Sequence, residues 1–126
     1  MKQIIRLCAV FFLAIGIQSC YYDNPPELLP FDCEDVSYST HVQPIFNNSC
    51  ATNGCHDGTT PPDLRSESSL NELRSQGYIN LVTPEESVLY KTVDFQENPM
   101  PPGGPKLSQT NIDIILCWIE AGARNN

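Results

Sequence analysis

Two cysteines and a histidine lie close together near the middle of the 126-residue chain, in the run Cys50-Ala51-Thr52-Asn53-Gly54-Cys55-His56. Thiols and imidazoles form disulfides, bind metal ions and hold haem groups. Three uses therefore fit this run. They are a Cys50–Cys55 disulfide in a tight loop, part of a zinc site, and the covalent attachment of a haem whose iron is bound by His56.

The spacing of the two cysteines bears on the choice between these uses. In the common haem-attachment pattern two residues separate the cysteines, each thiol adds to a vinyl group, and the next residue is the histidine that binds iron. Four residues separate them here, so the extra length must bulge outward, and Asn53-Gly54 favours the positive φ angles that a bulge needs. Zinc needs four good ligands, and the domain that follows the N-terminal segment otherwise offers only Cys33, Cys117, His41 and carboxylates without a paired spacing. The run favours haem, and the disulfide and the zinc site stay open as alternatives.

Short helices must position these side chains. The first is expected over residues 40 to about 48, capped by Ser39 and ending just before the cysteine pair. A second is expected from the capping box that begins at Ser69, and it should end near Gln76. A third should begin after Thr83, because proline follows directly and glutamate stands three residues on.

The last expected helix has the clearest boundaries and face. Ser108 should cap it, Gly122 should end it, and its apolar residues are Ile112, Ile114, Ile115, Leu116, Trp118 and Ile119. Residues 98–105 before it hold four prolines and two glycines, which predicts a loop of defined shape. The sequence thus predicts an all-α domain of three to four short helices and long loops. Helices this short in a domain of about 90 residues need a disulfide, a metal or a large cofactor to hold them together.

Several blocks of the sequence, in their order, resemble the monohaem cytochrome c family. They are Val42-Gln43-Pro44-Ile45-Phe46, Cys50, Gly54-Cys55-His56-Asp57-Gly58, Met100-Pro101-Pro102-Gly103-Gly104, Leu107-Ser108 and Trp118-Ile119-Glu120-Ala121-Gly122-Ala123. The likeness is to planctomycete-type cytochrome c domains of exported bacterial proteins, some of which have a four-residue spacer, and it covers roughly residues 36 to 124. It implies a small class I-like cytochrome c fold around one covalent haem, in which the final helix crosses the first.

The resemblance also implies a role for each matching residue. Cys50 and Cys55 would form thioethers to one haem c, with His56 and Met100 as the axial ligands of its iron. Met100 is the only methionine besides Met1. His41, nine residues before the first haem cysteine, is the rival for the second axial position. Because the first and last helices should cross, Cys33 and Cys117 are expected to form a disulfide; two separate thiols are the alternative.

The N-terminal residues predict export. Lys2 and Arg6 precede an apolar run too short to span a membrane, and Cys20 follows it, which looks like the cleavage box of a bacterial lipoprotein. We therefore expect a signal peptide over residues 1–19, a lipidated Cys20, an extended proline-rich and acidic tether over residues 20–35, and the cytochrome c domain over residues 36–126. A plain secretory signal that happens to end near a cysteine is the alternative.

Charge and export bear on the expected function. Loss of residues 1–19 removes two cations and no acidic residue, so the formal charge falls from −8 to −10. This charge argues against nucleic acid and suits a redox partner with a basic docking face. We expect a one-electron carrier rather than an enzyme, lipid-anchored to a bacterial membrane and facing the periplasm or the cell surface, with no small-molecule substrate. The alternatives are a haem peroxidase or a gas or redox sensor with an open iron site, and a haem-free, disulfide-stapled surface lipoprotein that acts as a binding module.

Overall fold

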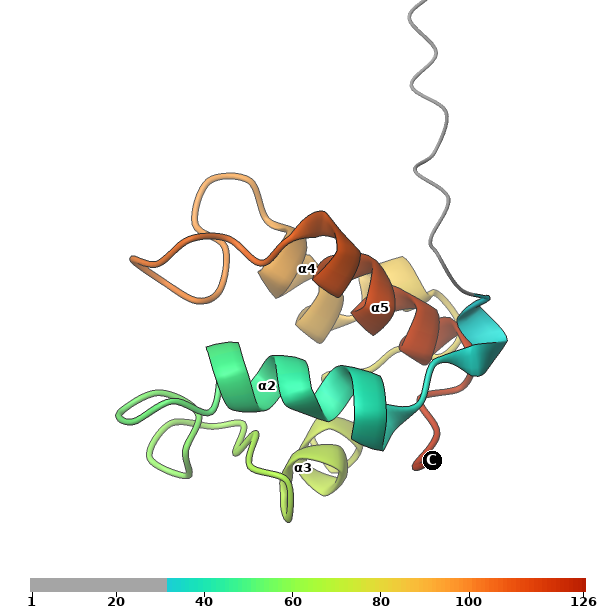
Figure 1. Ribbon diagram of the computed structural model, residues 1–126, viewed down its shortest axis with the longest axis horizontal. Coiled ribbons are helices and arrows are strands. Elements are labelled where there is room, and N and C mark those ends of the chain that lie inside the picture. The colour runs from blue at the N-terminus through green and yellow to red at the C-terminus, as the bar shows by residue number, and fades with distance from the viewer. Residues whose placement is uncertain (1–31) are drawn as a thin grey trace, which may run out of the picture.

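The computed structural model describes residues 32–126, which form helices joined by long loops (Figure 1). This part of the chain contains no strand, so the all-α prediction is confirmed for it. In chain order the elements are η1 (Cys33–Asp35), η2 (Tyr38–Val42), α2 (Gln43–Ser49), α3 (Ser69–Ser75), η3 (Pro84–Glu86), α4 (Val88–Asp94) and α5 (Gln109–Glu120). No helix among these residues is long and apolar enough to cross a membrane.

The first long helix is formed by η2 and α2, which follow each other without a break. It begins at Tyr38, two residues earlier than expected, and Ser39 is not its cap. The cap comes from the other end of the chain, because the backbone N–H groups of Tyr38 and Ser39 donate to Asn126 Oδ1 (2.9 Å) and to the Asn126 backbone oxygen (3.0 Å). The Ser39 hydroxyl also donates to that backbone oxygen, at 2.9 Å. A cap supplied from so far along the chain leaves no local sequence signal.

The final helix, α5, follows its prediction closely. The Ser108 side chain accepts a hydrogen bond from the Asn111 N–H (3.2 Å), and Gly122 ends the helix with φ of +92°. The helix packs against η1, η2, η3 and α4. Its buried residues are Ile112, Ile115, Cys117, Trp118 and Ile119, whereas Leu116 is only half-buried.

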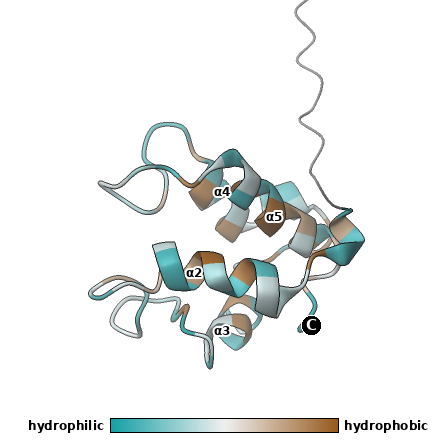
Figure 2. Cartoon of the chain, viewed as in Figure 1, coloured by the Kyte–Doolittle hydropathy of each residue, from teal (hydrophilic) through white to brown (hydrophobic). Residues whose placement is uncertain are grey.

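The core lies between these helices, and Figure 2 shows their apolar stretches turned toward the space between them. Trp118 is fully buried, its ring centroid lies 5.0 Å from that of Tyr38, and its indole N–H donates to the Arg124 backbone oxygen (2.8 Å). The last and first helices of the domain are therefore joined through two aromatic side chains.

The capping box predicted at Ser69 does not form. Ser69 is the first residue of α3 and is fully buried. Its hydroxyl accepts a hydrogen bond from the Tyr38 hydroxyl (2.6 Å) and donates to Gln43 Oε1 (2.6 Å). These partners on the first helix take the side chain that would have capped α3, and they fix α3 against that helix.

The helix expected after Thr83 is divided in two. Pro84–Glu86 forms a single 3₁₀ turn, and α4 starts only at Val88. The residue between them, Ser87, is buried, and its Oγ accepts a hydrogen bond from the Asn80 N–H at 2.9 Å. Ser87 has extended backbone that lets it reach Asn80, and this interrupts the helix.

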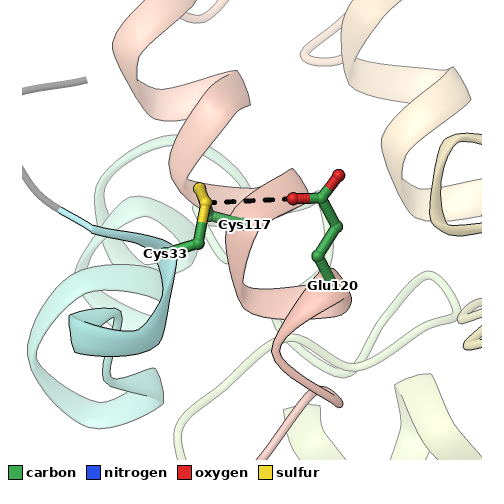
Figure 3. Close-up of side chains that lie close together, drawn as sticks. All are labelled: Cys33, Cys117 and Glu120. Carbon is green, nitrogen blue, oxygen red and sulfur yellow. Dashed lines mark hydrogen bonds between the residues drawn. A yellow bond between two sulfur atoms is a disulfide. The ribbon is translucent and has the colours of Figure 1, made fainter. Parts of the chain in front are cut away.

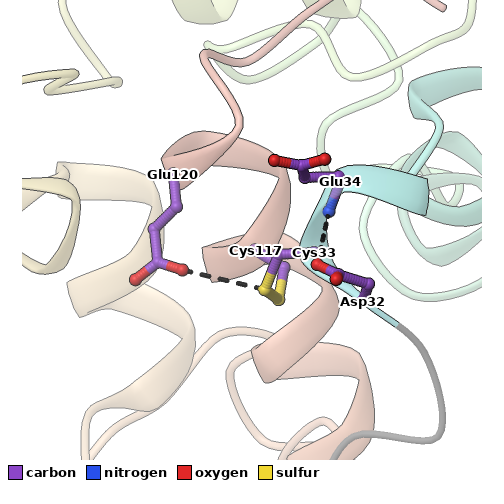
Figure 4. The surroundings of a disulfide bond; sticks show 5 residues. All are labelled: Asp32, Cys33, Glu34, Cys117 and Glu120. Carbon is purple, nitrogen blue, oxygen red and sulfur yellow. Dashed lines mark hydrogen bonds between the residues drawn. A yellow bond between two sulfur atoms is a disulfide. The ribbon is translucent and has the colours of Figure 1, made fainter.

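A disulfide joins Cys33 of η1 to Cys117 of α5 (Figure 3). Residues 33–35, which the sequence assigned to the tether, thus form a turn bonded to the domain. The Glu120 carboxylate lies 3.8 Å from Cys33 Sγ, and the Asp32 and Glu34 side chains lie close by (Figure 4). The predicted signal peptide and the lipidation site, Cys20, lie outside the described residues.

Candidate functional site

Cys50, Cys55 and His56 lie in the loop that follows α2. The backbone N–H of Cys50 still donates to the Phe46 oxygen (2.8 Å), and the N–H of His56 donates to the Cys50 oxygen (3.1 Å), which closes the loop on itself. Cys50 is buried, and Cys55 and His56 are half-buried. The two cysteines are separate thiols, so the structure does not contain the Cys50–Cys55 disulfide considered from the sequence. Burial, with a smaller contribution from Cys55, raises the pKa of the Cys50 thiol to about 11.

The four-residue spacer folds into a turn. The Cys55 N–H donates to the Thr52 oxygen (2.9 Å), and Gly54, the third residue of this turn, has φ of +81°, as in a type II turn. The positive φ predicted for the spacer therefore occurs at Gly54. A Cβ atom at Gly54 would meet no other atom within 4 Å, so the turn points into open space.

The ring of His56 is held by backbone carbonyl groups. Its Nδ1 atom lies 3.0 Å from the Pro62 oxygen and 3.2 Å from the Thr60 oxygen. Both oxygens only accept hydrogen bonds, so Nδ1 carries the proton, and in the neutral ring the lone pair is on Nε2. The Leu64 N–H donates to the His56 backbone oxygen (2.9 Å), so the segment that carries the Thr60 and Pro62 carbonyl groups is held beside His56. Nε2 is therefore the ring nitrogen of His56 that could ligate a metal.

Two cavities adjoin at His56. One, of about 180 Å³, is lined mainly by apolar side chains of α3, α4 and the loops beside them, among them Leu64, Leu73, Tyr78, Leu89 and Val93. The other, of about 270 Å³, is lined by the spacer and by the loop after Met100, including Cys55, Pro101 and Pro102. Four residues line both cavities: Cys50, His56, Pro61 and Met100.

The loop that carries Met100 is fixed to α4 at both ends. The Met100 N–H donates to the Thr92 oxygen (3.0 Å). At the far end of the loop, the Lys106 ammonium donates to the Asp94 backbone oxygen (3.0 Å) and carboxylate (3.2 Å). Met100 is half-buried and faces the cavities that His56 lines.

His41, the rival ligand from the sequence, is not brought to these cavities. It lies in η2, is exposed, and accepts the Ser37 N–H through Nδ1 (2.9 Å). It lines neither of the cavities that contain His56.

The side chains around these cavities can be compared with the disulfide, the zinc site and the haem attachment considered from the sequence. A zinc site needs ligand atoms that converge on one point. Among residues 32–126 the only such group of three comprises Cys33, Cys117 and Glu120, and the disulfide occupies two of its three ligands. Two thiols, one imidazole nitrogen and one thioether around an apolar space instead fit a c-type haem, which Cys50 and Cys55 would hold covalently and His56 and Met100 would ligate.

The sequence did not predict three hydrogen bonds of this site. They join His56 Nδ1 to the Pro62 oxygen, the Lys106 ammonium to the Asp94 carboxylate, and the Gly54 N–H to the Asp57 carboxylate (3.0 Å). Only Asp57 had a local signal, because an aspartate three residues after a turn glycine often accepts a backbone hydrogen bond.

Comparisons with protein families, with curated proteins and with solved structures find no match to this chain.

Proposed function

We propose that this chain carries one covalent c-type haem and works as a one-electron carrier with a class I-like cytochrome c fold. One observation carries the proposal: Cys50, His56 and Met100 line the same two adjoining cavities, although Met100 is 44 residues from His56 in the sequence. When bound, the haem supplies an iron that exchanges one electron between its ferrous and ferric states.

The cysteines would attach the group by simple addition. Each thiol adds across a vinyl double bond, so that sulfur bonds to one vinyl carbon and the thiol hydrogen goes to the other, and no oxidant or reductant is consumed. Burial raises the pKa of the Cys50 thiol to about 11, so the sulfur is protonated at neutral pH, as an ordinary thiol is. Cys50 is buried beside the apolar cavity and Cys55 lies nearer the surface.

The axial ligands would hold the iron from chain segments that are already fixed. The hydrogen bond from Nδ1 to Pro62 orients the His56 ring and leaves Nε2 for the metal. Met100 would offer a thioether from a loop held on α4, and thioether ligation and exclusion of water both favour a higher reduction potential. With both positions filled, no substrate needs to reach the iron, which favours a carrier over a peroxidase or sensor.

The charge of the protein suits a redox partner with a basic face. Three of its cations are already paired with carboxylates, in Arg65–Asp63, Lys91–Glu86 and Lys106–Asp94, so the remaining acidic groups dominate the field around the domain. Such a field speeds weak docking. Export and lipidation at Cys20 belong to the same proposal and are supported by the sequence alone.

The test is to produce the full chain in a bacterial host that matures c-type cytochromes. We expect haem to stay with the polypeptide after acid extraction and denaturing electrophoresis, and a Cys50→Ala, Cys55→Ala double variant to lose it. Met100→Ala should keep the haem, bind carbon monoxide quickly and lose the weak red absorption of an iron to methionine sulfur bond. His41→Ala is the matched control and should leave the spectrum unchanged.

Each outcome decides between the candidate functions. A colourless wild type from that host would overturn the haem proposal and favour the disulfide-stapled lipoprotein. A wild type that binds carbon monoxide as fast as Met100→Ala would mean an open iron site, and the carrier would give way to a peroxidase or sensor.

A further inference from the structure

Asp57, the residue directly after His56, is bonded to both sides of its own loop. One carboxylate oxygen accepts the Gly54 N–H at 3.0 Å. The other accepts the Thr59 N–H at 3.2 Å and the Thr59 hydroxyl at 2.6 Å. The proposed function assigns no role to this side chain, which is half-buried and lines neither cavity at His56.

The Gly54 bond adds to the few bonds that hold the spacer turn, of which one, from the His56 N–H to the Cys50 oxygen (3.1 Å), lies across its base. The turn contains a glycine at positive φ, no neighbouring group packs over that glycine, and within the turn only the bond from Cys55 N–H to Thr52 oxygen closes it. Glycine has more accessible backbone conformations than any other residue, so a turn with a single internal bond loses its shape easily. Asp57 adds a second bond, and that bond ties the turn to the residue beside His56.

The spacer is long, so the separation of the two cysteine sulfurs must be restricted in some way. The two sulfurs must reach attachment points at a fixed separation, whereas a four-residue spacer permits many separations between them. With the turn folded outward, Cys50 and Cys55 both line the cavity that His56 and Met100 also line.

We infer that Asp57 is a positioning residue for haem attachment, which holds the extra spacer residues in an outward turn so that both thiols stay beside His56. The inference rests on the proposed function and deepens it. It explains how this chain can use a four-residue spacer, and it predicts that loss of the Asp57 carboxylate leaves some haem attached through only one cysteine.

The experiment compares variants of the full chain produced in the same cytochrome-maturing host. Asp57→Ala removes both sets of bonds. Thr59→Val removes the hydroxyl that bonds both the second oxygen (2.6 Å) and the Cys55 backbone oxygen (3.1 Å), and it keeps the Gly54 bond. Asp57→Glu restores a carboxylate, and Asp35→Ala is the control that removes an exposed carboxylate from η1.

Two measurements are made on each purified protein. Intact mass gives the fraction of chains that carry haem. Alkylation followed by peptide mapping, together with the absorption band of the pyridine complex, gives the fraction joined through one thioether instead of two.

We expect Asp57→Ala to raise the single-thioether fraction by about threefold or more over wild type, since a hydrogen bond to a charged group is lost. Thr59→Val and Asp35→Ala should stay near wild type, and Asp57→Glu should recover part of the loss. A general loss of folding would lower total haem in all forms without favouring one thioether.

Two results would overturn the inference. One is an Asp57→Ala protein with the wild-type ratio of single to double thioethers. The other is a Thr59→Val protein as defective as Asp57→Ala, which would assign the effect to the other side of the loop. A wild type without haem would instead reject the proposed function itself, so the two failures are distinguishable.

Discussion

Reduction of the disulfide between Cys33 and Cys117 should cost the domain a large part of its stability. The bond closes a loop with a sequence separation of 84 residues. In the chain-entropy model a loop of this length restricts the unfolded chain by about 4.5 kcal/mol at 25 °C. Domains of this size are stable by only about 5 to 15 kcal/mol in total. The reduced protein should therefore be close to its unfolding limit.

The measurement is denaturant unfolding of oxidised and reduced protein, followed by circular dichroism. Reduction removes no heavy atom, so it leaves no cavity beside Cys117, which is 3% exposed, although the two sulfur atoms must move apart. The loss should arise mainly in the unfolded state and should appear as a lower midpoint with an equal or larger dependence on denaturant. Thioether bonds at Cys50 and Cys55 would not respond to the reductant.

A Cys33→Ala variant is the control, because it lacks the bond and keeps Cys117. Its midpoint should match that of the reduced wild type and should not change when reductant is added. A difference below about 1 kcal/mol between oxidised and reduced wild type would refute the reasoning from loop length. A shift in the control as large as that in the wild type would show that the reductant acts elsewhere.

Two further predictions concern the proposed haem site. Lys106→Met should free the end of the Met100 loop from Asp94. We then expect carbon monoxide to bind the ferrous protein about fivefold faster, as measured by flash photolysis. Variants of Asp94 should show the same effect. In the haem-free chain, burial raises the pKa of Cys50 from 9.0 to about 11, so the neutral thiol stabilises the fold fully below pH 9 and this contribution is lost as the pH rises to about 11. The free energy of unfolding, taken from denaturant titrations across this pH range, should fall by about 2 kcal/mol more for the wild type than for Cys50→Ala. An equal dependence on pH in the two proteins would contradict the assignment.

The sequence predicted the features whose causes are local, and the family resemblance added one bond between distant residues. The boundaries of α5 follow from Ser108 and Gly122, and the positive φ in the spacer follows from Gly54. The expected pairing of Cys33 with Cys117 came from a family resemblance and matches the bond in the structure. In each of these cases one residue type favours one backbone state or one bond strongly.

The features that the sequence did not predict depend on contacts between distant segments. Ser69 had a capping signal, but Tyr38 and Gln43 use its hydroxyl in the core. Asn126 caps a helix that begins 88 residues before it. The same holds in the proposed site, where the Pro62 backbone carbonyl orients His56. Every residue has a backbone carbonyl, so the sequence does not show which one accepts this bond.

The two ends of the described chain lie at one end of the long axis of the molecule. In Figure 1, η1 and the C-terminus are at the right, and the loops that carry the cysteine pair and Met100 extend to the left. If Cys20 is lipidated, the membrane attaches through residue 32 at the right, on the side remote from the loops that border both cavities. Under the proposed function, a soluble redox partner could then reach these loops from the side opposite to the point of attachment.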